Sequence, residues 1–120
     1  MCLIEKNRKV FQNLESNFKL LDNFQYQLNN SDSIIFLDKQ NNNPFDLVFL
    51  DPPFNQNLVP LTLGLLSQKN YLHSESQIYI ESEYEITPTI LDKNLSYNCR
   101  IKKQKKSGNV HYCLISLEAI

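Results

Sequence analysis

The chain has 120 residues, of which 42% are hydrophobic and 21% charged, and its formal net charge is −1. This composition is typical of one folded domain rather than a disordered chain. A charge so close to zero excludes a global basic field, so any nucleic-acid site must be local. No apolar run approaches the roughly 20 residues that cross a bilayer, and Met1–Lys6 lacks the layout of a signal peptide. We therefore expect a cytoplasmic protein that does not contact a membrane.

Cysteine and histidine usage argues against disulfides and metal sites. The three cysteines, Cys2, Cys99 and Cys113, are odd in number and form no Cys-x-x-Cys pair. Free, reduced and mostly buried thiols are the expectation. His73 and His111 lie far apart and have no acidic or thiol neighbour at ligand spacing. The pattern therefore predicts no metal site.

The first part of the chain predicts two short strands and a helix. The apolar run Cys2–Ile4 ends at Glu5 and is typical of a buried strand. A helix with one apolar stripe follows, and the stripe consists of Val10, Phe11, Leu14, Phe18 and Leu21. Asp22-Asn23 suits the end of that helix or a turn. Tyr26–Leu28 is consistent with a second short strand.

Polar residues then separate three further segments. Asn29–Asp32 is composed of turn and helix-capping residues, and Ile34–Leu37 predicts a short helical or irregular apolar segment. Gln40–Pro44 is expected to form a surface loop. Asp46–Leu50 holds a continuous apolar strand of the kind that parallel sheets bury on both faces.

The rest of the chain predicts a helix, a strand and a terminal hairpin. Leu58–Leu66 is expected to be helical, since Pro60 is tolerated in a first turn. Ile78–Ile80 with its neighbours predicts a strand. The last two strands are predicted at Tyr97–Lys105 and Val110–Leu117, and Ser107–Asn109 is the hairpin turn that joins them.

The order of these elements favours an α/β fold with a mostly parallel sheet, helices on both faces and a C-terminal antiparallel hairpin. In such sheets the ligand lies beyond the carboxyl ends of the strands. Glu5 and Asp51 both follow predicted strands, so we expect them at one rim.

The stretch Asp51-Pro52-Pro53-Phe54 carries the most specific chemistry. Two prolines after a buried strand make a rigid turn without backbone donors. Such a turn can present the Asp51 carboxylate, the Pro52 carbonyl and the Phe54 ring to one crevice. Two acceptors and a stacking surface are what an exocyclic base amine needs: the acceptors restore the nitrogen lone pair, and the ring holds the extruded base. The alternative is an ordinary proline-rich turn.

Two other acidic residues have a functional and a structural interpretation each. Glu5, at the end of a strand, could accept hydrogen bonds from the ribose hydroxyls of a nucleotide cofactor, or it could be a solvent-facing acid near a helix N-terminus. Asp32 could accept from an adenine amine, or it could cap a helix. The capping interpretation is slightly favoured for Asp32.

The segment Arg100–Lys106 holds five basic residues within seven positions. It could contact RNA phosphates. A charged edge strand that resists aggregation explains it slightly better, and the two interpretations are compatible.

Taken together, these motifs resemble the RsmD family, which methylates the N2 amine of a guanine in 16S ribosomal RNA. Three blocks carry the resemblance over nearly the whole chain. They are Leu3–Arg8 with the following helix, Phe45–Phe54, and Ile78–Glu83 with the late Gly108–Tyr112 hairpin. DNA adenine methylases share only the tetrapeptide and the general fold.

The resemblance implies a Rossmann-like fold that uses S-adenosylmethionine and acts on ribosomal RNA or the small ribosomal subunit. It implies that Glu5 binds the cofactor ribose and that Lys6 lies beside the adenine. By the same resemblance, Asp32 and Ser33 line the adenine pocket, and Asp51, Pro52, Pro53 and Phe54 are the catalytic residues that hold the guanine.

One departure from the family pattern concerns the cofactor loop. The family has a strand and a Phe-x-Gly-x-Gly loop before the first block, whereas this chain holds only Gly64 and Gly108. By this comparison, residues 1–120 form a partial, N-terminally truncated methyltransferase domain. It would lack the central strand between those ending at Glu5 and Asp51, and we expect the chain to be inactive by itself.

Two alternatives stay open. The same tetrapeptide serves methylation of an amine on DNA or of a protein glutamine. The chain could also be a non-catalytic fragment that pairs with another chain supplying the missing central strand, because open strand edges invite such pairing.

Overall fold

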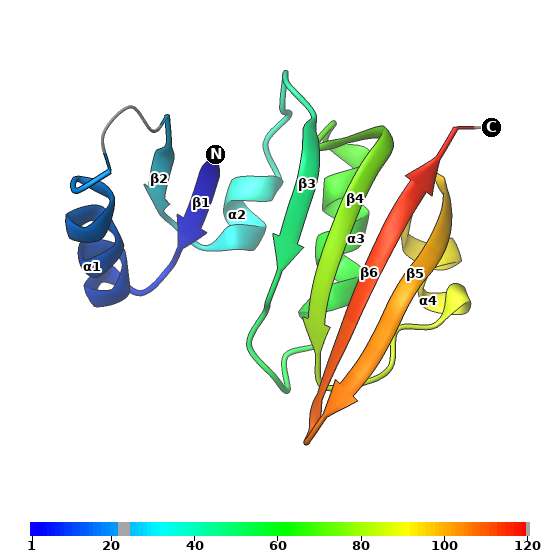
Figure 1. The fold of residues 1–120 in the computed structure, drawn as a ribbon. Helices are drawn as coiled ribbons and strands as arrows, with labels where there is room; N and C mark the ends of the chain where they lie inside the picture. Colours follow the sequence, from blue (N-terminus) through cyan, green and yellow to red (C-terminus); the bar gives the residue numbers. More distant parts are fainter. Residues whose placement is uncertain (22–24, 120) are drawn as a thin grey trace. The chain divides into compact units, whose positions relative to one another are not determined.

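The computed structural model describes residues 1–21 and 25–119, so the turn predicted at Asp22-Asn23 lies outside the described residues. The chain divides into two units, Met1–Lys39 and Gln40–Ile120, and each is described by itself (Figure 1). Among the described residues, no helix is both long enough and apolar enough to cross a membrane.

The first unit consists of β1 (Cys2–Glu5), α1 (Arg8–Phe18), β2 (Gln27–Asn30) and α2 (Ser33–Leu37). The two strands are parallel neighbours, paired from Cys2 with Gln27 to Glu5 with Asn30. The predicted strands and both helices are confirmed.

Two details of the first unit differ from the prediction. Asn29 and Asn30 belong to β2 rather than to a turn, because pairing with β1 continues to Glu5 and the Asn30 side chain donates to the backbone carbonyls of Glu5 and Lys6. Leu21 lies beyond the end of α1 and is 48% exposed. The apolar stripe predicted for this helix therefore includes one residue, Leu21, that lies beyond the end of α1.

The second unit is a four-stranded sheet with two helices. Its elements are β3 (Phe45–Leu50), α3 (Leu58–Gln68), β4 (Leu72–Ser82), α4 (Pro88–Asn94), β5 (Asn98–Ser107) and β6 (Val110–Glu118). The strand order is β3-β4-β6-β5, with β3 parallel to β4 and the other neighbours antiparallel. The α/β fold class with a C-terminal antiparallel hairpin is confirmed, and the sheet of this unit is mixed, with one parallel and two antiparallel pairs rather than mostly parallel ones.

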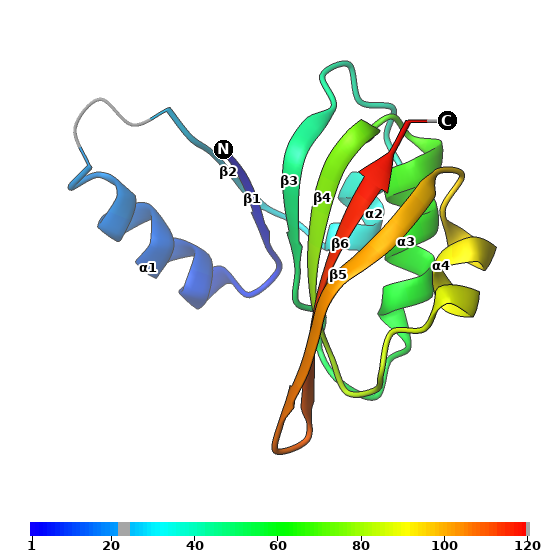
Figure 2. The same cartoon turned by 45° about the vertical axis from the view of Figure 1, so that its right-hand side comes forward.

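One face of this sheet is covered by α3 and α4 (Figure 2). Alternate residues of β4 and β6 point into the core, because successive strand side chains face opposite ways. Ile78, Ile80 and Ile115 are 0% exposed there, as is Leu63 of α3. Burial of these branched side chains supplies the main stabilisation of the unit.

The opposite face of the sheet carries aromatic side chains. The rings of Phe49 and Tyr79 lie 5.7 Å apart, and those of Tyr79 and Tyr112 lie 6.5 Å apart, between centroids. β3 is an edge strand of this sheet, and its Leu47 and Phe49 side chains are 47% and 70% exposed, so the expectation that both faces of this strand are buried is wrong for this unit. An apolar edge of this kind favours the addition of another strand.

Three details of the second unit were not predicted. β4 begins at Leu72, well before Ile78. The helix α4 was missed, although Thr87, which caps the Ile90 N–H, and Pro88 at the first helical position form a standard start signal. The hairpin turn consists of two residues rather than three, since Ser107 pairs with Val110 and Gly108 takes a φ of 59°.

The three thiols differ in environment. Cys113 is buried, whereas Cys2 and Cys99 are only half-buried, so the prediction of mostly buried thiols holds for one cysteine. Burial, with a smaller contribution from Cys99, raises the pKa of Cys113 to about 11.

Because the thiolate is the reactive form, we expect Cys113 to resist alkylation at pH 8 until the protein is unfolded. Mass spectrometry after iodoacetamide treatment checks this, and labelling of Cys113 as fast as Cys2 in the native state contradicts it.

Candidate functional site

The tetrapeptide Asp51-Pro52-Pro53-Phe54 directly follows β3, at the carboxyl end of the parallel pair β3 and β4. Asp51 is exposed and Pro52 is half-buried. The loop then turns through Asn55 and Asn57, whose φ values of 66° and 50° lie in the left-handed region. Asparagine tolerates this region better than most residues, so the sequence after the tetrapeptide suits a tight turn into α3.

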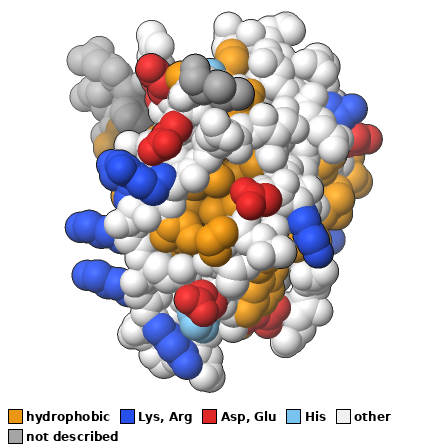
Figure 3. Space-filling view, turned by 90° about the vertical axis from the view of Figure 1, so that its right-hand side faces the viewer, with side chains coloured by type: hydrophobic (Ala, Val, Ile, Leu, Met, Phe, Trp, Pro, Cys, Tyr) orange, Lys and Arg blue, Asp and Glu red, His pale blue; other side chains and the backbone are white. Residues whose placement is uncertain are grey.

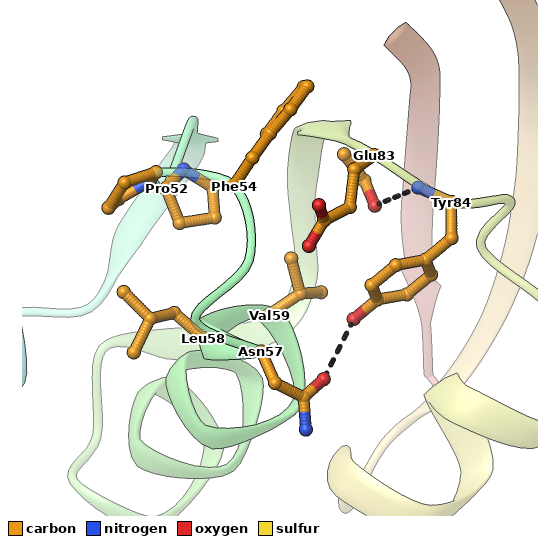
Figure 4. Close-up of a pocket in the computed structure, with 9 residues that line it drawn as sticks. Pro52, Phe54, Asn57, Leu58, Val59, Glu83 and Tyr84 are labelled. Carbon is orange, nitrogen blue, oxygen red and sulfur yellow. Dashed lines mark hydrogen bonds between the residues drawn. The ribbon is translucent and has the colours of Figure 1, made fainter. Parts of the chain in front are cut away.

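Side chains from the end of β4 hold this loop in place. Both carboxylate oxygens of Glu83 accept a hydrogen bond from the Asn55 N–H, at 2.9 and 3.0 Å. The Tyr84 hydroxyl lies 3.5 Å from Oδ1 of Asn57, and the Tyr84 N–H donates to the hydroxyl of Ser82 (Figure 4). The tetrapeptide is thus anchored one residue beyond its last member.

The anchored loop encloses only a small hollow of about 10 Å³. Its lining residues are Pro52, Pro53, Phe54, Asn57, Leu58, Val59, Ser82, Glu83 and Tyr84. Such a volume holds about one water molecule, so a purine does not fit inside it. Phe54 is 39% exposed, and its ring points away from the hollow (Figure 4). The surface that can stack on a base is therefore the outer face of this ring.

The rim also carries a tyrosine. Partial burial raises the pKa of Tyr79, and the neighbouring charges of Glu81 and, more weakly, Asp51 add to the effect. The Tyr79 hydroxyl donates to Oε1 of Glu81 at 3.3 Å. At neutral pH the Tyr79 hydroxyl is therefore protonated and donates to Glu81.

The Glu83 anchor can be tested directly. Replacing Glu83 by alanine leaves the Asn55 N–H without its acceptor, so we expect its amide hydrogen to exchange with solvent about fivefold faster, as for loss of a hydrogen bond worth about 1 kcal/mol. E83Q keeps one acceptor oxygen and should restore most of the protection. Nuclear magnetic resonance hydrogen exchange measures this, and equal rates in the three proteins would contradict the anchor.

The four predicted cofactor residues lie together in the first unit. Glu5 ends β1, and its Oε1 accepts from the Asn7 N–H at 3.0 Å. Asp32 caps α2: its Oδ1 accepts from the N–H groups of Ile34 and Ile35, and its Oδ2 lies 3.4 Å from the Lys6 ammonium. Ser33 is the exposed first residue of α2. The capping interpretation of Asp32 is confirmed.

Because of this cap, the pKa of Asp32 is lowered, first by the Ile35 N–H and then by the Ile34 N–H and Lys6. A lowered native pKa means that the stabilisation is complete above about pH 4 and is lost as the pH falls through the lowered value. We expect D32A to melt at a lower temperature than the wild type at pH 7, and D32N, another good cap, to melt close to it. Thermal unfolding by circular dichroism measures both, and equal melting of D32A and the wild type contradicts the assignment.

The sequence did not point to Glu83, Tyr84 or Asn57 as parts of the site. Glu83 stood at the end of a recognised block, but nothing in the residue pattern linked it to Asn55, 28 positions earlier. The link arises only from the parallel pairing of β3 and β4. The expectation that Glu5 and Asp51 share one rim stays a prediction, because they belong to different units.

Comparisons with known proteins agree on the family. A family model described as "Conserved hypothetical protein 95" matches residues 1–116. The chain is 36% identical over 118 residues to the ribosomal RNA small subunit methyltransferase D of Escherichia coli K12, covering 98% of the chain and 57% of that protein. It is 37% identical over 81 residues to the protein of the same name from Buchnera aphidicola, covering 68% of the chain and 42% of the relative. The chain thus spans about half the length of these curated relatives.

Solved structures give the same answer. A putative methyltransferase from Escherichia coli superposes with a TM-score of 0.84 at 34% identity, covering 99% of this chain and 63% of that one. A putative methylase from Haemophilus influenzae gives a TM-score of 0.82 at 33% identity, with 98% and 72% coverage. With the family match over residues 1–116, these findings place the chain in the conserved hypothetical protein 95 family, which includes the RsmD methyltransferases.

Proposed function

We propose that this chain is part of an S-adenosylmethionine-dependent methyltransferase that modifies the exocyclic N2 amine of a guanine in 16S ribosomal RNA. The observation that carries the proposal is the tetrapeptide loop, which presents the Asp51 carboxylate and the outer face of Phe54 on one anchored turn. The names of the relatives support the ribosomal substrate. A ribosomal substrate in turn favours a cytoplasmic location.

The chemistry assigned to the loop follows from its acceptors. A guanine amine is a poor nucleophile because its lone pair is delocalised into the ring. The Asp51 carboxylate and the Pro52 carbonyl each accept one amine hydrogen, which concentrates the lone pair on nitrogen, and Phe54 stacks on the base. When the amine nitrogen takes up the methyl group, the bond between the methyl carbon and the sulfonium sulfur would break, S-adenosylhomocysteine would leave, and the amine would lose a proton toward Asp51 or solvent. Bound S-adenosylmethionine supplies an activated methyl group, so orientation provides most of the remaining rate.

The first unit offers groups that suit the nucleoside part of this cofactor. Glu5 is half-buried and uses one oxygen on Asn7, which leaves Oε2 to accept from ribose hydroxyls. The exposed Ser33 hydroxyl and the Lys6 stem can line an adenine. Asp32 fits less well, since both of its oxygens already have partners.

A methyl-transfer assay tests the proposal. The chain covers 57% of the Escherichia coli relative, so a chimera can carry residues 1–120 in place of the matched segment. With radiolabelled cofactor, we expect transfer to small ribosomal subunits from a strain that lacks the relative, and product analysis should give N2-methylguanine. Transfer only to duplex DNA, or only to a release factor, would show instead the DNA or protein specificity that the tetrapeptide also permits.

Outside the chimera, the 120-residue chain by itself should bind the cofactor only weakly. Gly64 lies inside α3 and Gly108 in the hairpin turn, so neither lets the backbone approach a cofactor between a strand and a helix. We expect isothermal titration of the 120-residue chain with S-adenosylmethionine to show no micromolar binding. Micromolar affinity would refute this expectation.

A second candidate role is favoured by the edge of β3. Its exposed Leu47 and Phe49 suit pairing with an apolar strand from another polypeptide. In that case the chain would act as a non-catalytic fragment until its partner binds. Size-exclusion chromatography with light scattering distinguishes the cases, because a stable, fully folded monomer argues against pairing.

A further inference from the structure

We propose that the hairpin arm, defined as residues Lys102–His111 of β5 and β6, is an RNA phosphate-binding element that flanks the tetrapeptide loop. This proposal rests on the proposed function for its RNA substrate, and it assigns a role to a segment that the tetrapeptide chemistry does not use. Three properties of the arm carry it: its position, its uncompensated charge and its rigidity.

Strand pairing fixes the position of the arm. Leu50, the last residue of β3, pairs with Ile80, which pairs with Cys113, which pairs with Gln104. The next residues outward are Asp51, Glu81, Tyr112 and Lys105, one from each strand or its extension. Lys105 and Lys106 therefore lie at the same end of the sheet as the tetrapeptide, and the arm extends beyond that end (Figures 1 and 2).

The distance between the two elements suits a short RNA segment. β5 is three strand positions away from β3, which is about 14 Å at ordinary strand spacing. At about 3.4 Å per stacked nucleotide, this corresponds to roughly four nucleotides. An RNA whose target base stacks on Phe54 can therefore bring a phosphate a few nucleotides away to Lys105.

The positive charge of the arm is not balanced locally. Lys102, Lys103, Lys105 and Lys106 are all exposed, and none forms an ion pair with a described residue. Arg100 differs, because its guanidinium lies 3.6 Å from Glu118 at the far end of the hairpin. Figure 3, which views the molecule from the right-hand side of Figure 1, shows both acidic and basic side chains on that side.

Two aromatic residues lie next to the arm, and a tight turn closes it. Lys103, Lys105, Tyr112 and Tyr79 line a hollow of about 280 Å³ on the open face of the sheet, so cations and rings lie side by side, as in single-strand binding surfaces. The two-residue turn at Gly108 keeps both strands paired up to Ser107 and Val110. A rigid arm loses little conformational entropy when it binds.

Protection of an edge strand is the competing explanation, since β5 is an edge of the sheet and lysines there oppose aggregation. For that role the lysines could lie at any position along the strand. It explains neither why Lys105 and Lys106, which have no ion-pair partner among the described residues, lie at the tetrapeptide end nor why Arg100, near the other end, is ion-paired. The two explanations also predict different RNA affinities for the variants below.

The test uses the 120-residue chain and a fluorescent 12-nucleotide single-stranded RNA. In fluorescence anisotropy at 0.1 M salt, we expect K105Q/K106Q to bind about 25-fold more weakly than the wild type, because each lost phosphate contact costs roughly fivefold on a single strand. The slope of log affinity against log salt should fall by about 1.4. A charge-matched control, K9Q/K93Q, alters exposed lysines of α1 and α4 and should stay near the wild type.

Every other outcome overturns the proposal. Equal affinity of K105Q/K106Q and the wild type, an equal loss in the control, or no RNA binding by the wild type each contradicts it, because the arm is complete in this chain. Equally tight binding of poly-glutamate would assign the arm to an acidic protein partner instead. The chimera's methyl transfer is measured separately, so failure of the arm and failure of the proposed function are distinguishable.

Discussion

Replacing Leu63 by alanine should destabilise the second unit by about 2–5 kcal/mol, the range for truncating a fully buried leucine. Leu63 is 0% exposed and lies between Val59 and Leu66 on the covered face of α3. Truncation leaves a cavity that the branched side chains of β4 and β6 fill only in part. Urea unfolding followed by tyrosine fluorescence measures the loss, and five of the six tyrosines lie in this unit.

The same helix provides the control. Leu61 is 50% exposed, so L61A should change the free energy of unfolding by less than about 0.5 kcal/mol. Equal destabilisation by L63A and L61A would show that α3 does not pack on the sheet through the face containing Leu63.

The second large effect concerns the tetrapeptide. In the active chimera, D51A should lower kcat for methyl transfer by about 10²–10³-fold, comparable to the loss of one preorganised hydrogen-bonding group at a reacting centre. F54A should lower kcat/KM by roughly 5–150-fold, which corresponds to about 1–3 kcal/mol of base stacking. Steady-state kinetics with small subunits measures both.

Conservative variants separate chemistry from folding. F54Y retains a stacking ring and D51N retains one acceptor oxygen, so both should lose less than the alanine variants. The amide exchange rate of Asn55 should stay unchanged in D51A, because its acceptor is Glu83. Full activity of D51A would remove the tetrapeptide from the proposed chemistry.

Local patterns predicted much of this structure because the residues concerned act on their own backbone. Residue type and position favoured a helix cap over an adenine contact for Asp32, and it caps α2 through Ile34 and Ile35. The apolar run before Asp51 predicted β3, whose observed bounds differ by one residue. The turn residues around Gly108 predicted the position of the hairpin, although the turn is one residue shorter than expected.

What the sequence did not reveal depends on contacts between distant residues. Glu83 became part of the site only when β4 was placed beside β3. The position of Lys105 level with Glu81, on which the proposed RNA contact rests, also came only from the strand register. Neither fact is encoded in spacing along the chain, since both follow from which strands become neighbours.

The exposed edge of β3 also affects the tendency of the purified protein to aggregate. Phe45–Leu50 is a six-residue β-prone segment with one charge, Asp46, and no proline, which is the composition of segments that stack into cross-β fibrils. Asp46 is therefore a gatekeeper, and its carboxylate already lies 2.7 Å from Nε2 of His73. Recombinant chains in which Asp46 is neutral should accumulate in inclusion bodies and bind thioflavin T sooner than the wild type.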